Sequence, residues 1–398
     1  MPNPVIEPEV VHPAGRSQAV VLLLASCLPV LGSVLLAPVL PNIQQAFAST
    51  PGVAALTPIV LTAPALMIGL TAPVAGRVVG RTGRKRLLVI GLVAYGLFGT
   101  APLWLPSLGL IVASRVLVGI AEAAIMTCCT TLLADYFHGQ QRQRYFGLQT
   151  VCTTVAATLF FALGGLLGGL GWRTPFWLYA ASLPLALLAI RYLWEPTGSQ
   201  ERSGAVPLAW RRLAVPVGVT LVGGLVFYTL IVELPYVLGG VGVDSPATIG
   251  VISALASLAT AAGATLFARL ADRGPGLTLT LAFLFSGIGL GVLAFASGLP
   301  LVITGAVVTG VGNGLLLPAL ITWALGRLSF DQRPRASGVW TAALFIGQFV
   351  CPLAVLALSE AINGLSSALL VIGLVALVLS PVGKAVGSVD AKPVRVGQ

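Results

Sequence analysis

The sequence predicts an all-α membrane protein whose twelve transmembrane helices form two pseudo-symmetric six-helix bundles. The 398-residue chain is 57% hydrophobic and only 9% charged, whereas a soluble domain carries about 25% charged residues. Its apolar residues gather in twelve segments, and pairs of sequence motifs recur half a chain apart. These three observations exclude a soluble binding module, because most of the surface of this chain does not face water.

The twelve apolar segments are long enough to be membrane-spanning helices. Each is close to or longer than the ~20 residues that a helix needs to cross ~30 Å of hydrocarbon. They lack the alternation of barrel strands, and a helix satisfies its own backbone hydrogen bonds in lipid. The segments are 17–40, 53–75, 87–106, 108–134, 145–170, 174–194, 213–238, 246–270, 277–297, 299–325, 336–359 and 365–383.

The positive charges fall almost entirely on one side of these segments. With a cytoplasmic N-terminus, all but two of the 22 Lys and Arg residues lie on the cytoplasmic side, the exceptions being Arg115 and Arg173. Because short loops rich in Lys and Arg stay in the cytoplasm, we expect a multi-pass protein of the plasma (inner) membrane with both termini cytoplasmic. The net charge of +10 then reflects topology, and no nucleic acid is needed as a partner.

Five of these cations lie in one glycine-rich stretch, GRVVGRTGRKR, over residues 76–86. The stretch resembles the loop between helices 2 and 3 of the major facilitator superfamily, approximately G-x-x-x-D-R-x-G-R-[RK]. The matching positions are Gly76, Arg81, Gly83, Arg84 and Lys85. Gly80 stands where the family has an acid that latches the two halves together. The resemblance therefore implies a gating loop with an altered latch.

A second copy of this loop follows half a chain later. ARLADRG, at the end of the eighth segment, contains Asp272 and Arg273 and so has the acid that the first copy lacks. At nearly the same spacing, residues 142–150 and 333–341 share the pattern R-x-R-x-x-G-x-x-T. Correspondences in register indicate a duplicated six-helix unit, and they add Asp272 and Arg273 to the candidate gating residues.

The repeat divides the chain into residues 1–194 and residues 213–398, each a predicted bundle of six helices. Residues 195–212 are polar and interrupted by Pro, Gly and Ser, which is typical of a linker, here a cytoplasmic one. Two bundles joined in this way are the architecture of a major facilitator, with alternating access at their interface. GWRTPFWLYA, over residues 171–180, also resembles the turn into helix 6 of the drug-exporting members.

Three ionisable residues lie at membrane depth: Arg115, Glu122 and Glu233. Each costs about 2.5–3.5 kcal/mol on insertion scales and is therefore a functional candidate. Arg115 and Glu122 share one face of the fourth segment, ~10 Å apart along its axis. RVLVG, beginning at Arg115, resembles the family's helix-4 motif R-x-x-x-G, whose arginine is linked to proton movement. Proton coupling is the predicted role of this pair, and a fixed structural ion pair is the alternative.

Glu233 lies in the outer third of the seventh segment. It could bind a cationic substrate, carry a proton or remain wetted by an outer vestibule. Asp135, at the cytoplasmic end of the fourth segment, could pair with Arg81 or Arg84 and supply the acid that is missing at Gly80. That pairing would make Asp135 a gating residue.

Two amides are predicted at the midplane of the second half. Asn313 corresponds to Glu122 in the repeat, and Gln348 lies in the eleventh segment. We expect both to line a cavity, with hydrogen bonding between helices as the alternative. Some aromatic residues could also line the cavity, with ordinary packing or lipid-facing roles as the alternative. They are Phe160, Phe161, Phe227, Tyr228, Phe345 and Phe349.

These features predict a secondary active transporter that exports small amphiphilic or drug-like compounds by proton-coupled alternating access, similar to the twelve-helix drug:proton antiporters. The chain has no P-loop, no catalytic constellation and no metal-ligand spacing, so we expect neither an enzyme nor a cofactor beyond a proton gradient. Helix 5 reads FFALGG from Phe160, where family antiporters have G-P-x-x-G-G. This departure leaves uptake of a small organic metabolite, by proton symport or uniport, as the alternative. A monomer in the lipid bilayer, with a small-molecule substrate and protons as its other partners, is the family expectation.

Overall fold

The computed structural model describes residues 14–196, 208, 210–326, 328–329, 332–362 and 364–383, and within these ranges every regular element is helical. Eleven helical stretches among them are long and apolar enough to cross a membrane. A twelfth, Leu365–Leu379, is apolar but shorter. The predicted all-α membrane fold is therefore confirmed.

The helices follow one another with short connections. The first six spans contain α1 (Arg16–Ser26), α2 (Leu28–Val34), η1 (Ala37–Val39), α3 (Leu40–Ala46), α4 (Val53–Thr82), α5 (Arg84–Thr100), η2 (Ala101–Leu103), α6 (Leu108–Tyr136), α7 (Gly139–Gly168), η3 (Thr174–Ala181) and α8 (Ser182–Tyr192). The remaining spans contain α9 (Trp210–Gly240), α10 (Pro246–Leu270), η4 (Ala271–Arg273), α11 (Pro275–Ala294), α12 (Leu299–Gly326), α13 (Arg333–Ala361) and α14 (Leu365–Leu379).

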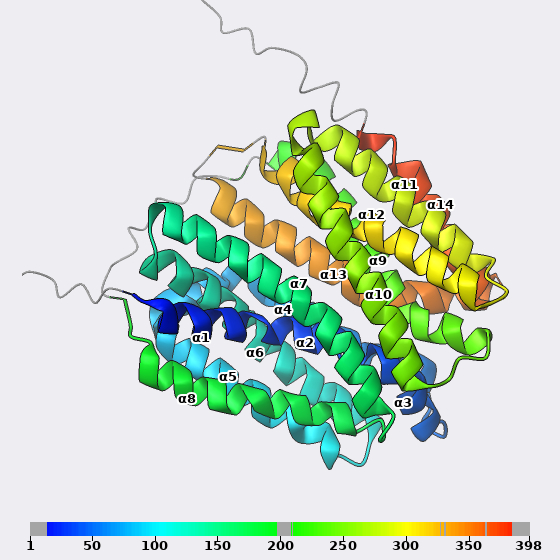
Figure 1. Ribbon diagram of the computed structural model, residues 1–398, viewed down its shortest axis with the longest axis horizontal. Coiled ribbons are helices and arrows are strands. Elements are labelled where there is room, and N and C mark those ends of the chain that lie inside the picture. The colour runs from blue at the N-terminus through cyan, green and yellow to red at the C-terminus, as the bar shows by residue number, and fades with distance from the viewer. Residues whose placement is uncertain are drawn as a thin grey trace, which may run out of the picture.

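The elements from α1 to α8 pack as one group, and those from α9 to α14 pack as a second group (Figure 1). The two groups meet chiefly along two helix pairs, α4 with α13 and α7 with α10. The chain passes from one group to the other through the predicted linker at residues 195–212, most of which lies outside the described residues.

Successive spans alternate in direction, so the turns lie on two faces of the molecule. We call the face with the turns at Gly83, Phe137–His138 and η4 the basic face, because the arginines of the gating loop lie there. The other face, with the turns at residues 47–52 and 169–173, is called the opposite face. The helix α1 begins at the basic face, and α14 ends there.

The first span is not one continuous helix. Pro29 is the second residue of α2, Pro38 lies in η1 and Pro41 is the second residue of α3. Proline removes a backbone donor and clashes with the preceding turn, which explains why this span breaks into four short elements. Two main-chain carbonyls near the breaks accept hydrogen bonds from tyrosines: Leu28 from the Tyr95 hydroxyl at 2.6 Å and Ser33 from the Tyr228 hydroxyl at 2.8 Å.

Candidate functional site

A cavity of about 610 Å³ lies between the two groups of helices. Its walls come from α2, α4, α6 and α7 of the first group and from α9, α10, α12 and α13 of the second group. Among the described residues that line it, none is Asp, Glu, Lys, Arg or His. The lining is mostly aliphatic and aromatic, with scattered hydroxyl and amide groups. Such a wall suits a drug-sized organic molecule.

The cavity is closed toward the opposite face by the crossing of α7 and α10. A Cβ atom built on Gly165 would overlap the carbonyl oxygen of Pro246 and come within 2.7 Å of the Gly250 Cα. Only glycine allows two helix backbones to approach so closely. Further along the same pair, the hydroxyls of Thr158 and Ser257 are hydrogen-bonded at 3.0 Å.

The same two helices separate toward the basic face. The ribbons of α7 and α10 lie together near α3 and diverge toward their other ends (Figure 1). A Cβ atom at Gly147, near the basic-face end of α7, would meet nothing within 4 Å. The cavity lining extends into this region through Thr150 and Ala264, both exposed. The cavity therefore opens toward the basic face.

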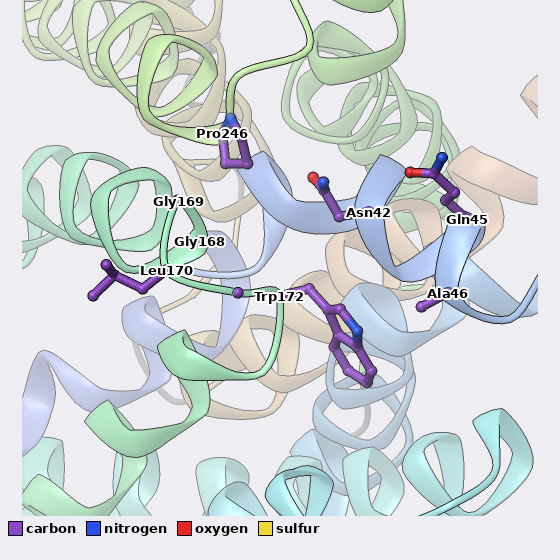
Figure 2. A pocket seen from close by; sticks show the side chains of 9 residues that line it. Asn42, Gln45, Ala46, Gly168, Gly169, Leu170, Trp172 and Pro246 are labelled. Atoms are coloured by element: carbon purple, nitrogen blue, oxygen red, sulfur yellow. The ribbon is translucent and has the colours of Figure 1, made fainter.

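A second pocket, of about 530 Å³, lies on the opposite face just beyond the helix crossing. Asn42 from α3, Trp172 from the turn after α7, and Pro246 at the start of α10 surround the same space (Figure 2). Gly168 also lines it, and a Cβ atom there would overlap Val39. The crossing of α7 and α10 thus separates this outer pocket from the central cavity.

The two predicted amides both reach the cavity lining. Asn313 also donates from Nδ2 to the carbonyl of Phe227 at 3.0 Å and accepts from the Ser286 hydroxyl at 3.3 Å. It therefore lines the cavity and ties α12 to α9 and α11 at the same time. Gln348 lines the cavity with no hydrogen bond to any described residue. Of the six aromatic candidates, four line the cavity: Phe161, Phe227, Tyr228 and Phe345.

Arg115 and Glu122 lie inside the first helix group and not in the cavity lining. Both are fully buried, and the structure holds no ion pair between them. The Arg115 guanidinium lies 4.6 Å from the ring centre of Tyr179 and 5.5 Å from that of Phe176, as in cation–π contacts. These rings, supplied by η3, take the place of a carboxylate partner for the arginine.

Glu122 lies against the broken first span. A Cβ atom at Gly32 would overlap its carboxylate, so Gly32 provides the space that this side chain occupies. Neither carboxylate oxygen of Glu122 has a hydrogen-bond partner among the described residues. The other buried acid, Glu233 on α9, is 7% exposed and also lies outside the lining, although its neighbour Leu234 belongs to it.

The gating loop forms the tight connection between α4 and α5. Gly83 has a φ of 87°, which favours glycine, and Gly76 and Arg81 lie in the last turns of α4. Arg84 pairs with Asp135 through Nε and Oδ2 at 3.0 Å, which is one of the two pairings that the sequence suggested. In the second copy of the loop, Asp272 and Arg273 form η4 and are exposed.

Glu195, which the sequence did not indicate as a candidate residue, also lies at this loop. Its carboxylate accepts hydrogen bonds from the backbone N–H groups of Arg84 and Lys85, and it therefore caps the first turn of α5. Acids stabilise helix N-termini because the first N–H groups have no partner within the helix. Glu195 lies about half of the first bundle away in the chain, so no local pattern linked it to the loop.

We expect Glu195→Gln to destabilise this face of the first bundle. The amide keeps one acceptor oxygen but loses the charge that strengthens both hydrogen bonds. Loss of a helix cap costs about 1 kcal/mol, which for a chain of 398 residues corresponds to a fall in melting temperature of roughly 1 °C. The measurement is thermal unfolding of the purified protein in detergent. The matched control is Glu360→Gln, an exposed acid near the end of α13, and equal melting of the two variants would contradict the capping role.

A cavity between two helix bundles, closed at one end and open at the other, is the arrangement of a secondary transporter. The chain belongs to the Major Facilitator Superfamily, whose family model matches residues 22–244 and 217–393.

Curated relatives match parts of the chain. The class C tetracycline resistance protein of Escherichia coli is 30% identical over 54% of this chain and 55% of its own length. The 3-(3-hydroxy-phenyl)propionate transporter of Escherichia coli K12 is 29% identical over 68% of each chain. Multidrug resistance protein 1 of Bacillus subtilis is 33% identical over 33% of this chain and 34% of its own length. The matches to the two resistance proteins thus span about half or less of those relatives.

Solved structures agree with the fold over almost the whole chain. A bacterial homologue of the human lysosomal transporter Spinster, in an inward-facing and unoccupied conformation, superposes with a TM-score of 0.78 at 16% identity. That match covers 96% of this chain and 100% of the homologue. A nucleoside transporter superposes with a TM-score of 0.75 at 12% identity, over 93% of this chain and 99% of its own. At these identities the likeness establishes the major facilitator fold alone.

Proposed function

We propose that this protein is a secondary active transporter that exports small amphiphilic compounds in exchange for protons. The observation that carries the proposal is the cavity between the two helix groups. Its lining is mostly apolar, and it is closed at one end by the glycine crossing, where α7 and α10 meet at Gly165 and Gly250. The resistance proteins among the relatives support export of drug-like molecules.

The basic face is the cytoplasmic face in this proposal. Loops rich in Lys and Arg remain on the cytoplasmic side, and the gating loop is the richest of them. The cavity then opens to the cytoplasm, where an exporter loads its substrate. Separation of α7 from α10 at the glycine crossing would connect the cavity to the outer pocket, through which substrate leaves. Both termini are cytoplasmic, and the protein works as a monomer in the inner membrane.

Glu122 is the residue that we assign to proton coupling, with Arg115 on the same helix. Burying a carboxylate charge without a partner costs several kcal/mol, so this site favours different arrangements when Glu122 is charged and when it is neutral. Its contact is α2, the helix that also lines the cavity through Pro29 and Ser33. Proton loading at Glu122 can therefore act on the cavity wall through α2.

Three further assignments complete the proposal. The substrate contacts are Asn313 and Gln348, while Glu233 is a second candidate for the proton. The residues of the gate on the cytoplasmic side are Gly76, Arg81, Gly83, Arg84, Asp135, Asp272 and Arg273. The salt bridge between Arg84 and Asp135 supports this gate within the first bundle.

Uptake of an organic acid is the second candidate, because the hydroxy-phenyl-propionate transporter matches the longest stretch of the three relatives named above. An organic anion needs a cationic partner in its site. Among the described residues that line the cavity there is none, and Arg115 lies behind the wall against Tyr179. The geometry therefore favours export.

The test is flux in proteoliposomes of known orientation under an imposed pH gradient. With the proton gradient directed toward the cytoplasmic face, a neutral lipophilic dye is expected to move in the opposite direction, against its own gradient. Reversing the pH gradient is expected to reverse the flux. Movement of an organic acid together with protons would replace export by uptake.

A further inference from the structure

Among the described residues, no charged side chain lines the central cavity. The ionisable side chains at membrane depth, Arg115, Glu122 and Glu233, all lie outside the lining. A permanently charged molecule that enters such a cavity loses its water and gains no counter-charge, and that transfer is strongly unfavourable. The described wall thus selects against ions of either sign.

The hydroxyl groups of the wall are mostly occupied as donors. Five of them donate to the carbonyl four residues earlier in their own helix, at distances of 2.8–3.1 Å. These are Ser33, Thr150, Thr153, Thr154 and Thr260. A hydroxyl has one proton and two lone pairs. Each of these groups therefore presents only acceptor capacity to the cavity.

The tyrosine and the amides extend this pattern. The Tyr228 hydroxyl donates to the carbonyl of Ser33, so it too has only lone pairs left. Asn313 uses one N–H on Phe227 and its oxygen on Ser286. Among the described lining residues Gln348 alone offers a whole amide without a partner. Ser253 also makes no hydrogen bond to a described residue, so it keeps its proton as a donor. Six hydroxyl groups of the wall nevertheless present only lone pairs, so its hydroxyls offer mainly acceptors.

We infer that the cavity binds uncharged lipophilic molecules that carry hydrogen-bond donors, such as aromatic amines, amides and phenols. The inference rests on the proposed export function and narrows its substrate class. The apolar body of such a molecule packs against Phe161, Phe227 and Phe345, and its N–H or O–H groups meet the hydroxyl lone pairs. A volume of about 610 Å³ accommodates a drug-sized compound of this kind.

The test uses three coumarins that differ at one position. 7-Amino-4-methylcoumarin is neutral with N–H donors, the 7-dimethylamino compound is neutral without donors, and the 7-trimethylammonio compound is a permanent cation. Binding to the purified protein in nanodiscs is measured by equilibrium dialysis without any gradient. The amine is expected to bind, and the cation at least about tenfold more weakly. Equal binding of amine and cation, or no binding of the amine, overturns the inference.

Two double variants test the acceptor wall. Thr154→Val with Thr260→Val removes two acceptors from the cavity wall, one on α7 and one on α10. The matched control is Thr130→Val with Thr304→Val, two exposed threonines that make the same bond to their own helices. The first double variant is expected to bind the amine about three- to tenfold more weakly than the unaltered protein does. Its binding of the dimethylamino compound is expected to be unchanged. Equal effects on both compounds, or equal effects of both variants, overturn the donor preference.

A charge placed in the wall tests the exclusion of ions. Gln348→Glu puts a carboxylate where the free amide stood, and at pH 8 the cation is expected to bind at least about tenfold more tightly to this variant than to the unaltered protein. No gain for the cation would count against charge as the reason for its exclusion.

Binding and transport separate this inference from the proposed function. If the amine binds as expected but no pH gradient drives its flux, the export proposal fails and the ligand class stands. If a pH gradient drives flux of the permanent cation as well as of the amine, export stands and the ligand class is overturned.

Discussion

Glu122→Gln is expected to abolish transport driven by a pH gradient while substrate exchange at equal pH continues. Glutamine has nearly the same shape as glutamate, so it fits the space that Gly32 leaves beside α2 and the fold is kept. It cannot take up or release a proton in the working pH range. Flux under a pH gradient should fall to that of liposomes without protein. Counterflow, which needs alternating access but no net proton movement, should remain.

Glu233→Gln is the matched comparison, because Glu233 is the other buried acid at membrane depth. If Glu122 carries the coupling proton, this variant keeps proton-driven flux. The opposite pattern, with flux retained in Glu122→Gln and lost in Glu233→Gln, would assign the proton to α9. Retention in both variants would remove these two acids from the mechanism.

Gly32→Ala offers an independent check through the same contact. Its methyl group would occupy the space of the Glu122 carboxylate, so the acid must move or α2 must shift. We expect impaired proton-driven flux although the acid itself is present. The same two flux assays measure it, and full activity would show that the packing of Glu122 against α2 is not used.

The general fold followed from the sequence because lipid imposes simple rules on length, hydrophobicity and loop charge. Asn313 and Gln348 were predicted for the same reason, since polar groups stand out in apolar helices. The breaks in the first span also have a visible signal in the sequence, namely Pro29, Pro38 and Pro41.

Nothing in the sequence indicated that Arg115 and Glu122 lie behind the cavity wall. Apart from these two residues, a few small polar ones and Asp135 at its end, their helix α6 is apolar around its whole circumference. Periodicity therefore does not indicate which face meets the cavity. Which ring covers Arg115 depends on η3, a segment distant in sequence. Glu195 was missed because a helix cap supplied by a distant residue leaves no spacing to recognise. Packing between helices, rather than the helices themselves, was the part that the sequence left open.

The closure of the cavity toward the opposite face depends on close packing of this kind, at the crossing of α7 and α10. A Cβ atom at Gly165 would collide with the backbone of Pro246 and Gly250, neither of which can turn aside as a flexible side chain could. Overpacking of this kind costs about 1–3 kcal/mol, and it applies only to the state in which α7 and α10 touch. A difference of that size changes the ratio of two states about 5- to 150-fold.

Gly165→Leu is therefore expected to open the cavity toward the opposite face. The measurement is labelling of Ala157→Cys, a position in the cavity wall, by an impermeant maleimide in a background without other cysteines. With Gly165 present, we expect labelling from the basic face; with leucine, labelling from the opposite face should rise. Gly291→Leu is the control, because a Cβ atom there meets nothing within 4 Å. If Gly165→Leu is still labelled only from the basic face, the glycine crossing is not the barrier, and the closure must be sought at α3 and the outer pocket, where Gly168 meets Val39.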